Sequence, residues 1–204
     1  MPRSDDYLTA IHLAREKLSA EPFERIRSRS GFGAVAADVL RVPFLDRVYR
    51  VGYPGFEFTD EADANREAPL QEQVLLLHYL MAEGPASPAG QWVAYREIPG
   101  AGFYFSAFVK RAVDPLKSSF GRNPGAFVAA AGRLGGLAVE PGDAGFEFAV
   151  LPHVTLRLIL YTADEEFPAE ANILFERRIG GLLSPEDIAW LAGMLVYRLV
   201  ALSR

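Results

Sequence analysis

Two groups of polar residues in this sequence have the composition to bind a small charged molecule. The first group is Arg96-Glu97, which precedes the glycine-rich turn Gly100-Ala101-Gly102 and is followed by Tyr104. An arginine and a tyrosine beside such a turn would donate hydrogen bonds to an anion. An exposed Arg–Glu pair without a ligand would contribute only about 0–1 kcal/mol to stability. The sequence therefore predicts an anion-binding cleft at Arg96, Glu97 and Tyr104, with an ordinary surface ion pair as the alternative.

The second group is the acidic loop Asp164-Glu165-Glu166, the densest run of carboxylates in the chain. Carboxylate oxygens are ligands for hard cations such as Mg²⁺, and a carboxylate can also act as a general base. Asp164 and Glu166 are the candidates for these roles. Consecutive side chains rarely converge on one point, so a solvated hairpin loop is the alternative.

Arg157 is the charged residue in the middle of the otherwise apolar segment 154–161. An unpaired buried charge is very costly, so a covered sheet face would require a carboxylate partner. Glu170 and the acidic loop belong to the same predicted hairpin and are the natural candidates. If that face is wet, Arg157 needs no partner, and the sequence leaves both arrangements open.

The motifs of the commonest catalytic and cofactor sites do not occur in the chain. It has no Cys, no P-loop, no HExxH and no GxSxG, and its three histidines (His12, His78 and His153) have no metal-ligand spacing. His78 lies on an apolar helix, where a neutral core histidine is the commoner reading than an axial ligand. No metal site is predicted, the cofactor is unknown, and the sequence does not decide whether the protein is an enzyme.

Charge and hydropathy exclude two classes of partner. The 204 residues include 21 Lys and Arg against 26 Asp and Glu, a formal charge of -5, whereas proteins that bind nucleic acid need a field of basic residues. The most apolar segment, Ile188–Leu202, contains Arg198 and is too short to span a bilayer. The N-terminus is acidic and lacks the apolar stretch of a signal peptide. We expect a cytoplasmic protein without nucleic acid or membrane partners.

Hydrophobic periodicity predicts an α+β fold with mainly antiparallel sheets packed against buried helices, in a single compact domain over residues 1–204. Strands occur in runs and do not alternate with helices, which favours this class over a doubly wound parallel sheet. The predicted order is a helical N-terminal segment at 4–30, a strand-rich segment of two or three strands at 34–58, a helical region at 69–134, a β-meander at 145–176 and a C-terminal helix at 185–203.

Two helices and one strand have clear local signals. Pro69 suits the first turn of a helix at 69–83 whose surface is nearly all apolar, and Ser184-Pro185 is a strong helix start. Within 154–161, residues alternate between an apolar face and a face that carries Arg157. Residues 92–98 also read as a strand, which would place Arg96-Glu97 at a strand end.

Several segments together resemble a prokaryotic family of unknown function found mostly in anaerobes. The most specific is the hairpin segment from Asp164 through Asn172 to Phe175. The others are Leu75 to Leu80, Tyr95 to Pro99 with Gly102 to Phe105, Leu183 to Asp187, and more loosely Ser30-Gly31, Pro43 to Leu45 and Arg47-x-Tyr49.

The resemblance favours two segments as the ligand site and suggests the kind of metabolism in which the protein acts. It favours the Arg96-Glu97 turn and the Asp164–Asn172 hairpin, Asn172 included, over the lone histidines as a ligand site. Some members of the family look fused to ferredoxin-like or corrinoid-protein modules. Because this chain has no Cys for a cluster of its own, the resemblance implies that such a redox or corrinoid partner is a separate protein.

Three functions remain open at this point. The first is a non-catalytic protein that binds a small anionic ligand or serves a redox or corrinoid partner in anaerobic metabolism. The second is a carboxylate-based hydrolase or lyase, Mg- or Mn-assisted, that acts on an anionic small molecule. The third is a structural homodimer without a site. The first is our preferred hypothesis, and it requires folding to bring the Arg96-Glu97 turn and the Asp164–Asn172 hairpin together.

Overall fold

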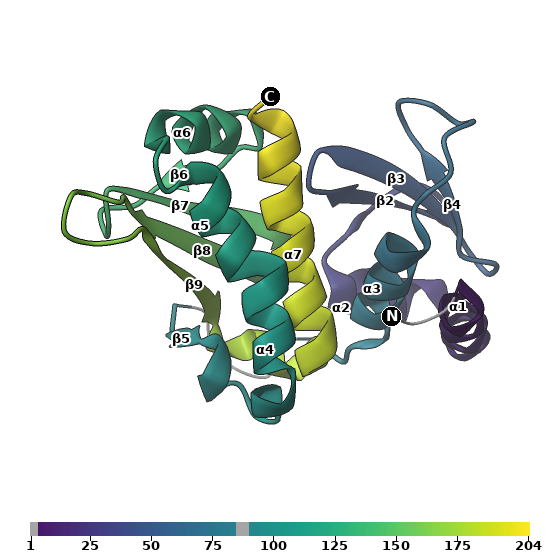
Figure 1. The fold of residues 1–204 in the computed structure, drawn as a ribbon. Coiled ribbons are helices and arrows are strands. Elements are labelled where there is room, and N and C mark those ends of the chain that lie inside the picture. The colour runs from purple at the N-terminus through teal and green to yellow at the C-terminus, as the bar shows by residue number, and fades with distance from the viewer. Residues whose placement is uncertain (1–3, 85–89) are drawn as a thin grey trace. The chain divides into compact units, whose positions relative to one another are not determined.

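The computed structural model describes residues 4–84 and 90–204. Contacts along the chain divide it into two compact units, residues 1–84 and 85–204, so the single domain predicted for 1–204 consists of two such parts. Each unit has its own antiparallel sheet and its own helices (Figure 1). The predicted α+β class with antiparallel sheets and buried helices is confirmed.

Three helices belong to the first unit, α1 (Ser4–Ser19), α2 (Phe23–Ser30) and α3 (Leu70–Met81). Prolines and glycines define their ends. Pro22 is the N-cap of α2, and Gly31 ends that helix with φ 74°, a left-handed conformation that glycine adopts without steric cost. Pro69 is the N-cap of α3. Helix α3 packs against α1 and α2 and buries residues on most of its circumference, Glu72 among them.

The sheet of the first unit has four strands in the order β1-β2-β3-β4, all antiparallel. Two or three strands were predicted here, and the structure has β1 (Gly33–Ala36), β2 (Val39–Phe44), β3 (Arg47–Gly52) and β4 (Glu57–Asp60). Strands β2 and β3 alternate between buried and exposed residues, with Leu40, Val42, Tyr49 and Val51 on the buried side. This period of two places Tyr49 in the core of the first unit.

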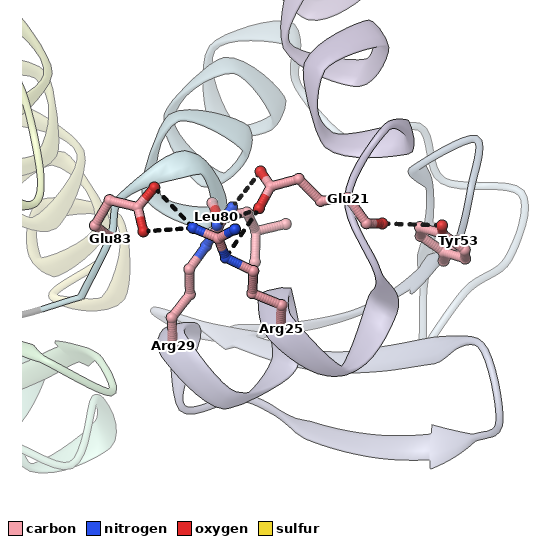
Figure 2. Close-up of polar contacts among 6 residues, drawn as sticks. All are labelled: Glu21, Arg25, Arg29, Tyr53, Leu80 and Glu83. Carbon is pink, nitrogen blue, oxygen red and sulfur yellow. Dashed lines mark hydrogen bonds and ion pairs between the residues drawn. The ribbon is translucent and has the colours of Figure 1, made fainter.

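An arginine joins α2 to the C-terminal end of α3 (Figure 2). The guanidinium of Arg29 pairs with the carboxylate of Glu21 and also donates to the carbonyl of Leu80 from Nε and Nη2, at 3.0 and 2.8 Å. Arg25 donates to Glu83 at 3.1 Å, and the hydroxyl of Tyr53 donates to the carbonyl of Glu21. The Arg29 side chain is only 7% exposed. Its donors satisfy a carbonyl that the last turn of α3 leaves without an intrahelical partner.

The sheet of the second unit has five antiparallel strands in the order β5-β9-β8-β7-β6. Strands β7 and β8 form a hairpin, and β9 returns beside β8. The strands are β5 (Trp92–Ala94), β6 (Leu137–Ala138), β7 (Ala144–Leu151), β8 (Val154–Tyr161) and β9 (Glu170–Glu176).

Helices cover one face of this second sheet. Helices α5 and α6 contact strands β7 to β9, and α7 packs against α4, α5 and α6 (Figure 1). The α-helices are α4 (Phe105–Phe108), α5 (Asp114–Phe120), α6 (Pro124–Arg133) and α7 (Pro185–Leu202), and 3-10 turns occupy Tyr95–Glu97, Ala101–Tyr104 and Arg177–Gly181.

A π-helical turn, Val109–Val113, joins α4 to α5. Pro115 explains it, because proline has no N–H to donate to the carbonyl of Arg111 and the helix widens ahead of such a residue. Asn123 caps α6 and Ser184 caps α7, where the serine hydroxyl accepts from the N–H of Asp187 at 3.2 Å.

The strand predicted at 92–98 is where the structure differs most from the elements expected from the sequence. It ends at Ala94, and residues 95–97 turn away from the sheet as a 3-10 helix. Residues 85–89, within the helical region predicted at 69–134, lie outside the described residues. Among the described helices, none combines the length and apolar character required to cross a membrane.

Candidate functional site

The Arg96-Glu97 turn is held together by contacts within its own neighbourhood. The Arg96 guanidinium lies 3.7 Å from the centre of the Phe105 ring, a cation–π arrangement. The Glu97 carboxylate accepts a hydrogen bond from the Ala94 N–H at 2.7 Å and closes the 3-10 turn. Both residues are exposed. These contacts position the turn.

Tyr104 and its aromatic neighbours lie between this turn and α7. The negative charge of Glu186, together with partial burial and a hydrogen bond to Glu186, raises the pKa of Tyr104. Tyr95 stacks on Phe108 at 4.3 Å and donates to the carbonyl of Pro185, and burial raises the pKa of Tyr95 to about 12. Tyr95 and Phe108 are therefore core, Tyr104 and Phe105 are half-buried, and Phe103 is 87% exposed.

The acidic loop forms a compact turn. One oxygen of the Asp164 carboxylate accepts from the N–H groups of Glu166 and Phe167, at 2.8 and 2.7 Å, which is a typical aspartate turn. The Glu166 side chain is exposed. Asn172 is an exposed residue of β9 and pairs with Ile159 across the sheet.

Arg157 has a carboxylate partner, but neither Glu170 nor the acidic loop provides it. The partner is Glu147, which faces Arg157 directly across the β7–β8 hairpin and forms an ion pair with it. The guanidinium also lies 4.2 Å from the ring of Trp92. The expectation from sequence was wrong on the partner because the hairpin register, which the sequence pattern left open, decides which carboxylate lies opposite.

The residues favoured from sequence are thus held by separate sets of contacts. In the part of the chain that the structure describes, no hydrogen bond, ion pair or ring contact joins Arg96, Glu97 or Tyr104 to the Asp164–Asn172 hairpin. Ala94 pairs with Leu174, so the turn leaves the sheet beside the second half of β9, whereas the acidic loop precedes the first residue of that strand. Across residues 4–84 and 90–204, no three His, Asp or Glu side chains cluster as a metal site would require.

A charged hollow of about 300 Å³ lies in the first unit, between the β2–β3 turn and the end of β4. We call it the charged hollow. Its walls come from two short segments and carry two cations and three carboxylates: Asp46, Arg47, Val48, Asp60, Glu61, Ala62 and Arg66. The two segments are joined by the hydrogen bond from the Glu61 N–H to the Val48 carbonyl, at 2.8 Å. Of these residues, Glu61 is already paired with Arg41.

Arg47 is connected to a buried carboxylate through a tyrosine. Its Nη1 donates to the hydroxyl of Tyr49 at 3.1 Å, and that hydroxyl donates to the Glu72 carboxylate at 2.6 Å. Tyr49 is fully buried and Glu72 is 6% exposed. Burial, followed by the hydrogen bond to Glu72, raises the pKa of Tyr49. The phenol therefore stays protonated and orients Arg47 at the wall of the charged hollow.

Two features of the charged hollow are unusual for an inert surface. The Nε of Arg47 is buried and has no hydrogen-bond partner among the described residues. Asp60 is 4% exposed, accepts one hydrogen bond from the Ala62 N–H at 3.0 Å, and has no Lys or Arg partner within the described residues. Buried polar groups are normally satisfied by hydrogen bonds or ion pairs, so these two groups distinguish the charged hollow from an ordinary surface.

The turn that leads into the charged hollow has an uncommon backbone conformation. Leu45, just before Asp46, has φ 55°, a left-handed conformation that costs a non-glycine residue about 1–2 kcal/mol. Outliers of this kind concentrate at binding sites and tight turns. Here the conformation reverses the chain between Phe44 and Arg47, which pair in the β2–β3 hairpin.

Sequence reasoning noticed only part of this site. Arg47-x-Tyr49 carried one of the looser resemblances, but Asp60 and Glu72 drew no attention. A signal was present for both. Glu72 is an acid within a helix whose surface is nearly all apolar, and Asp60 ends a strand whose period places it on the buried side with Tyr49.

A family model for a domain of unknown function, DUF3786, matches residues 22–198, which is most of the chain and covers part of each unit. The chain belongs to this family. The match includes every residue of the charged hollow and all seven residues favoured from sequence. A search of curated proteins found no match, and a search of solved structures found none.

Proposed function

We propose that this DUF3786 protein is a non-catalytic binding protein for a small charged molecule, and that the molecule occupies the charged hollow. The observation that supports this proposal is the pair of opposite charges, the half-buried Arg47 and the buried Asp60, which line one hollow without an ion pair between them among the described residues. A hollow of about 300 Å³ is at the lower end of the usual range for small-ligand pockets, about 300–1,000 Å³.

The chemistry of the hollow favours binding over catalysis. Its polar groups are guanidinium donors and carboxylate acceptors, and its lining contains no Ser, Thr, Lys or His that would serve as a nucleophile or proton shuttle. The carboxylate-based hydrolase considered from sequence relies on Asp164, whose carboxylate accepts hydrogen bonds from the amides of its own loop. The binding hypothesis is therefore the one that the geometry supports best.

The resemblance noted from the sequence suggests where the proposed binding protein acts and which partner it serves. It suggests a ligand carrier in the cytoplasm of an anaerobe that serves a separate redox or corrinoid protein. This setting follows from the resemblance alone and stays a prediction.

The test is a thermal-melting screen of the whole chain against small carboxylates, amines, amino acids, phosphate esters and nucleotides. A ligand present at 100 times its Kd adds about 2.7 kcal/mol to the free energy of unfolding, which a melting curve detects readily. We expect one chemical class to raise the melting temperature of the wild type, and to lose that effect in Asp60→Asn and Arg47→Gln.

Two variants with exposed charges elsewhere are the matched controls. Asp38→Asn and Arg122→Gln remove the same charges from exposed positions outside the charged hollow. We expect them to keep the ligand effect. A ligand whose effect survives undiminished in both hollow variants, or a screen in which no class raises the melting temperature, contradicts the proposed function.

A further inference from the structure

We infer that the ligand of the charged hollow is amphoteric: a small molecule with a carboxylate, which Arg47 binds, and a protonated amine, which Asp60 binds. This inference rests on the proposed function and names the class of ligand. The inference is supported by the opposite charges of Arg47 and Asp60, which we call the two anchors of the ligand, and by their positions on adjacent strands.

The anionic end of the ligand has its partner in Arg47. A guanidinium has five N–H donors in a planar fork that matches a carboxylate. Tyr49 takes one donor of Nη1, so the guanidinium keeps other Nη donors for a ligand. Arg66, exposed and without a side-chain partner in the described part of the chain, adds a second positive charge on the wall of the hollow.

The cationic end of the ligand has its partner in Asp60. The one contact that the structure gives its side chain is the hydrogen bond from the Ala62 N–H to Oδ1, which leaves Oδ2 as an acceptor. The Asp60 carboxylate is only 4% exposed and forms no ion pair among the described residues, so a ligand ammonium would supply an opposite charge in direct contact with it. Asp46 adds negative charge on the same wall.

Strand register fixes the separation of the two anchors. Tyr49 pairs directly with Asp60 across β3 and β4, and Arg47 lies two residues before Tyr49 on the same face. Arg47 and Asp60 are therefore diagonal neighbours, which in antiparallel pairs lie about 7–8 Å apart. A short molecule with one charge at each end can contact both side chains. A dicarboxylate or a diamine that spanned Arg47 and Asp60 would place one of its charges against a residue of the same sign.

The experiment compares amphoteric ligands of increasing chain length with two ligands of the longest chain length that each carry a single charge. Glycine, β-alanine and γ-aminobutyrate are the amphoteric probes, and butyrate and butylamine each lack one charged group. Isothermal titration of the whole chain measures the affinities. We expect at least one amphoteric probe to bind about tenfold or more tightly than butyrate and butylamine, because each charged hydrogen bond is worth about 1.5–3 kcal/mol.

Two substitutions assign the ends of the ligand. Asp60→Asn preserves the side-chain shape and the acceptor for the Ala62 N–H. It should lower the affinity of the protein for the amphoteric probe to its affinity for butyrate. Arg47→Gln should reduce it to the affinity of butylamine. Asp38→Asn is the control, and circular dichroism verifies that each variant is folded.

The outcomes separate this inference from the proposed function. If butyrate, butylamine or phosphate binds in the hollow and all three amphoteric probes fail at 10 times that concentration, the ligand class is wrong and the binding function stands. Failure of the amphoteric probes to bind at all also overturns the ligand class. An amphoteric probe whose affinity is unchanged in Asp60→Asn contradicts the assignment of its amine.

Discussion

The hydroxyl of Tyr49 is the clearest point at which to test the architecture of the charged hollow. It accepts from Arg47 and donates to Glu72 at 2.6 Å, and it is enclosed by the core of the first unit. Tyr49→Phe removes this hydroxyl and leaves the aromatic ring in place. The substitution therefore takes a donor from a buried carboxylate and an acceptor from a guanidinium with almost no change in packing.

A second tyrosine provides a matched comparison. Tyr79, on α3, is 2% exposed and donates to the backbone carbonyl of Ser30 at 2.9 Å. A hydrogen bond to a charged group contributes about 1.5–3 kcal/mol, and one between neutral groups contributes about 0.5–1.5 kcal/mol. We expect Tyr49→Phe to lower the free energy of unfolding by about 2 kcal/mol and Tyr79→Phe by about 1 kcal/mol.

Urea unfolding measured by far-UV circular dichroism gives both values. Tryptophan fluorescence does not suit this purpose, because Trp92 and Trp190 both belong to the second unit. Hydrogen exchange of peptides from 47–52 and 70–81 reports the same loss locally. The double variant with Glu72→Gln should show a coupling of about 1 kcal/mol. Equal costs for the two tyrosines, or no coupling to Glu72, would refute the proposed connection from Arg47 to Glu72.

Three further predictions follow from other contacts. The hydrogen bond from Arg29 lowers the pKa of Glu21 (Figure 2). The contribution of this ion pair to the free energy of unfolding is therefore complete above the ordinary pKa of 4.5 and is lost as the pH falls below that value. Urea titrations at pH 3 to 7 should show this loss in the wild type and a smaller loss in Glu21→Gln. Ser184→Ala should lower the free energy of unfolding by about 1 kcal/mol through loss of the α7 cap, and a change below about 0.3 kcal/mol would contradict the capping role. At Leu45, with φ 55°, glycine should give a more stable protein than alanine by about 1 kcal/mol in thermal melts, the reverse of the usual order.

Elements governed by local rules were predictable from the sequence. The Ser184-Pro185 start of α7, the helix after Pro69 and the alternation along β8 depend on neighbouring residues, and the structure has all three. The 3-10 turn at 95–97 was not predictable from hydrophobicity alone, because Val93 and Tyr95 are buried with a spacing of two residues, as they would be in a strand.

The site depends on contacts between segments distant in sequence. Glu147 lies opposite Arg157 because of the β7–β8 register, and no pattern within either strand specifies that register. The charged hollow needs Arg47, Asp60 and Glu72 from three elements, and no pattern within one element shows that these three residues meet. A single acid on an apolar helix, such as Glu72, is the signal that sequence reasoning can use in future.

The central claim is that a small charged molecule occupies the charged hollow, and locating the bound ligand tests it most directly. Backbone amide chemical shifts of the isotope-labelled chain, recorded as a ligand from the melting screen is added, locate the site residue by residue. The account predicts that the largest changes occur at Arg47, Val48 and Ala62, around the charged hollow. Changes concentrated at Arg96 and Asn172, with the charged hollow unaffected, would contradict it.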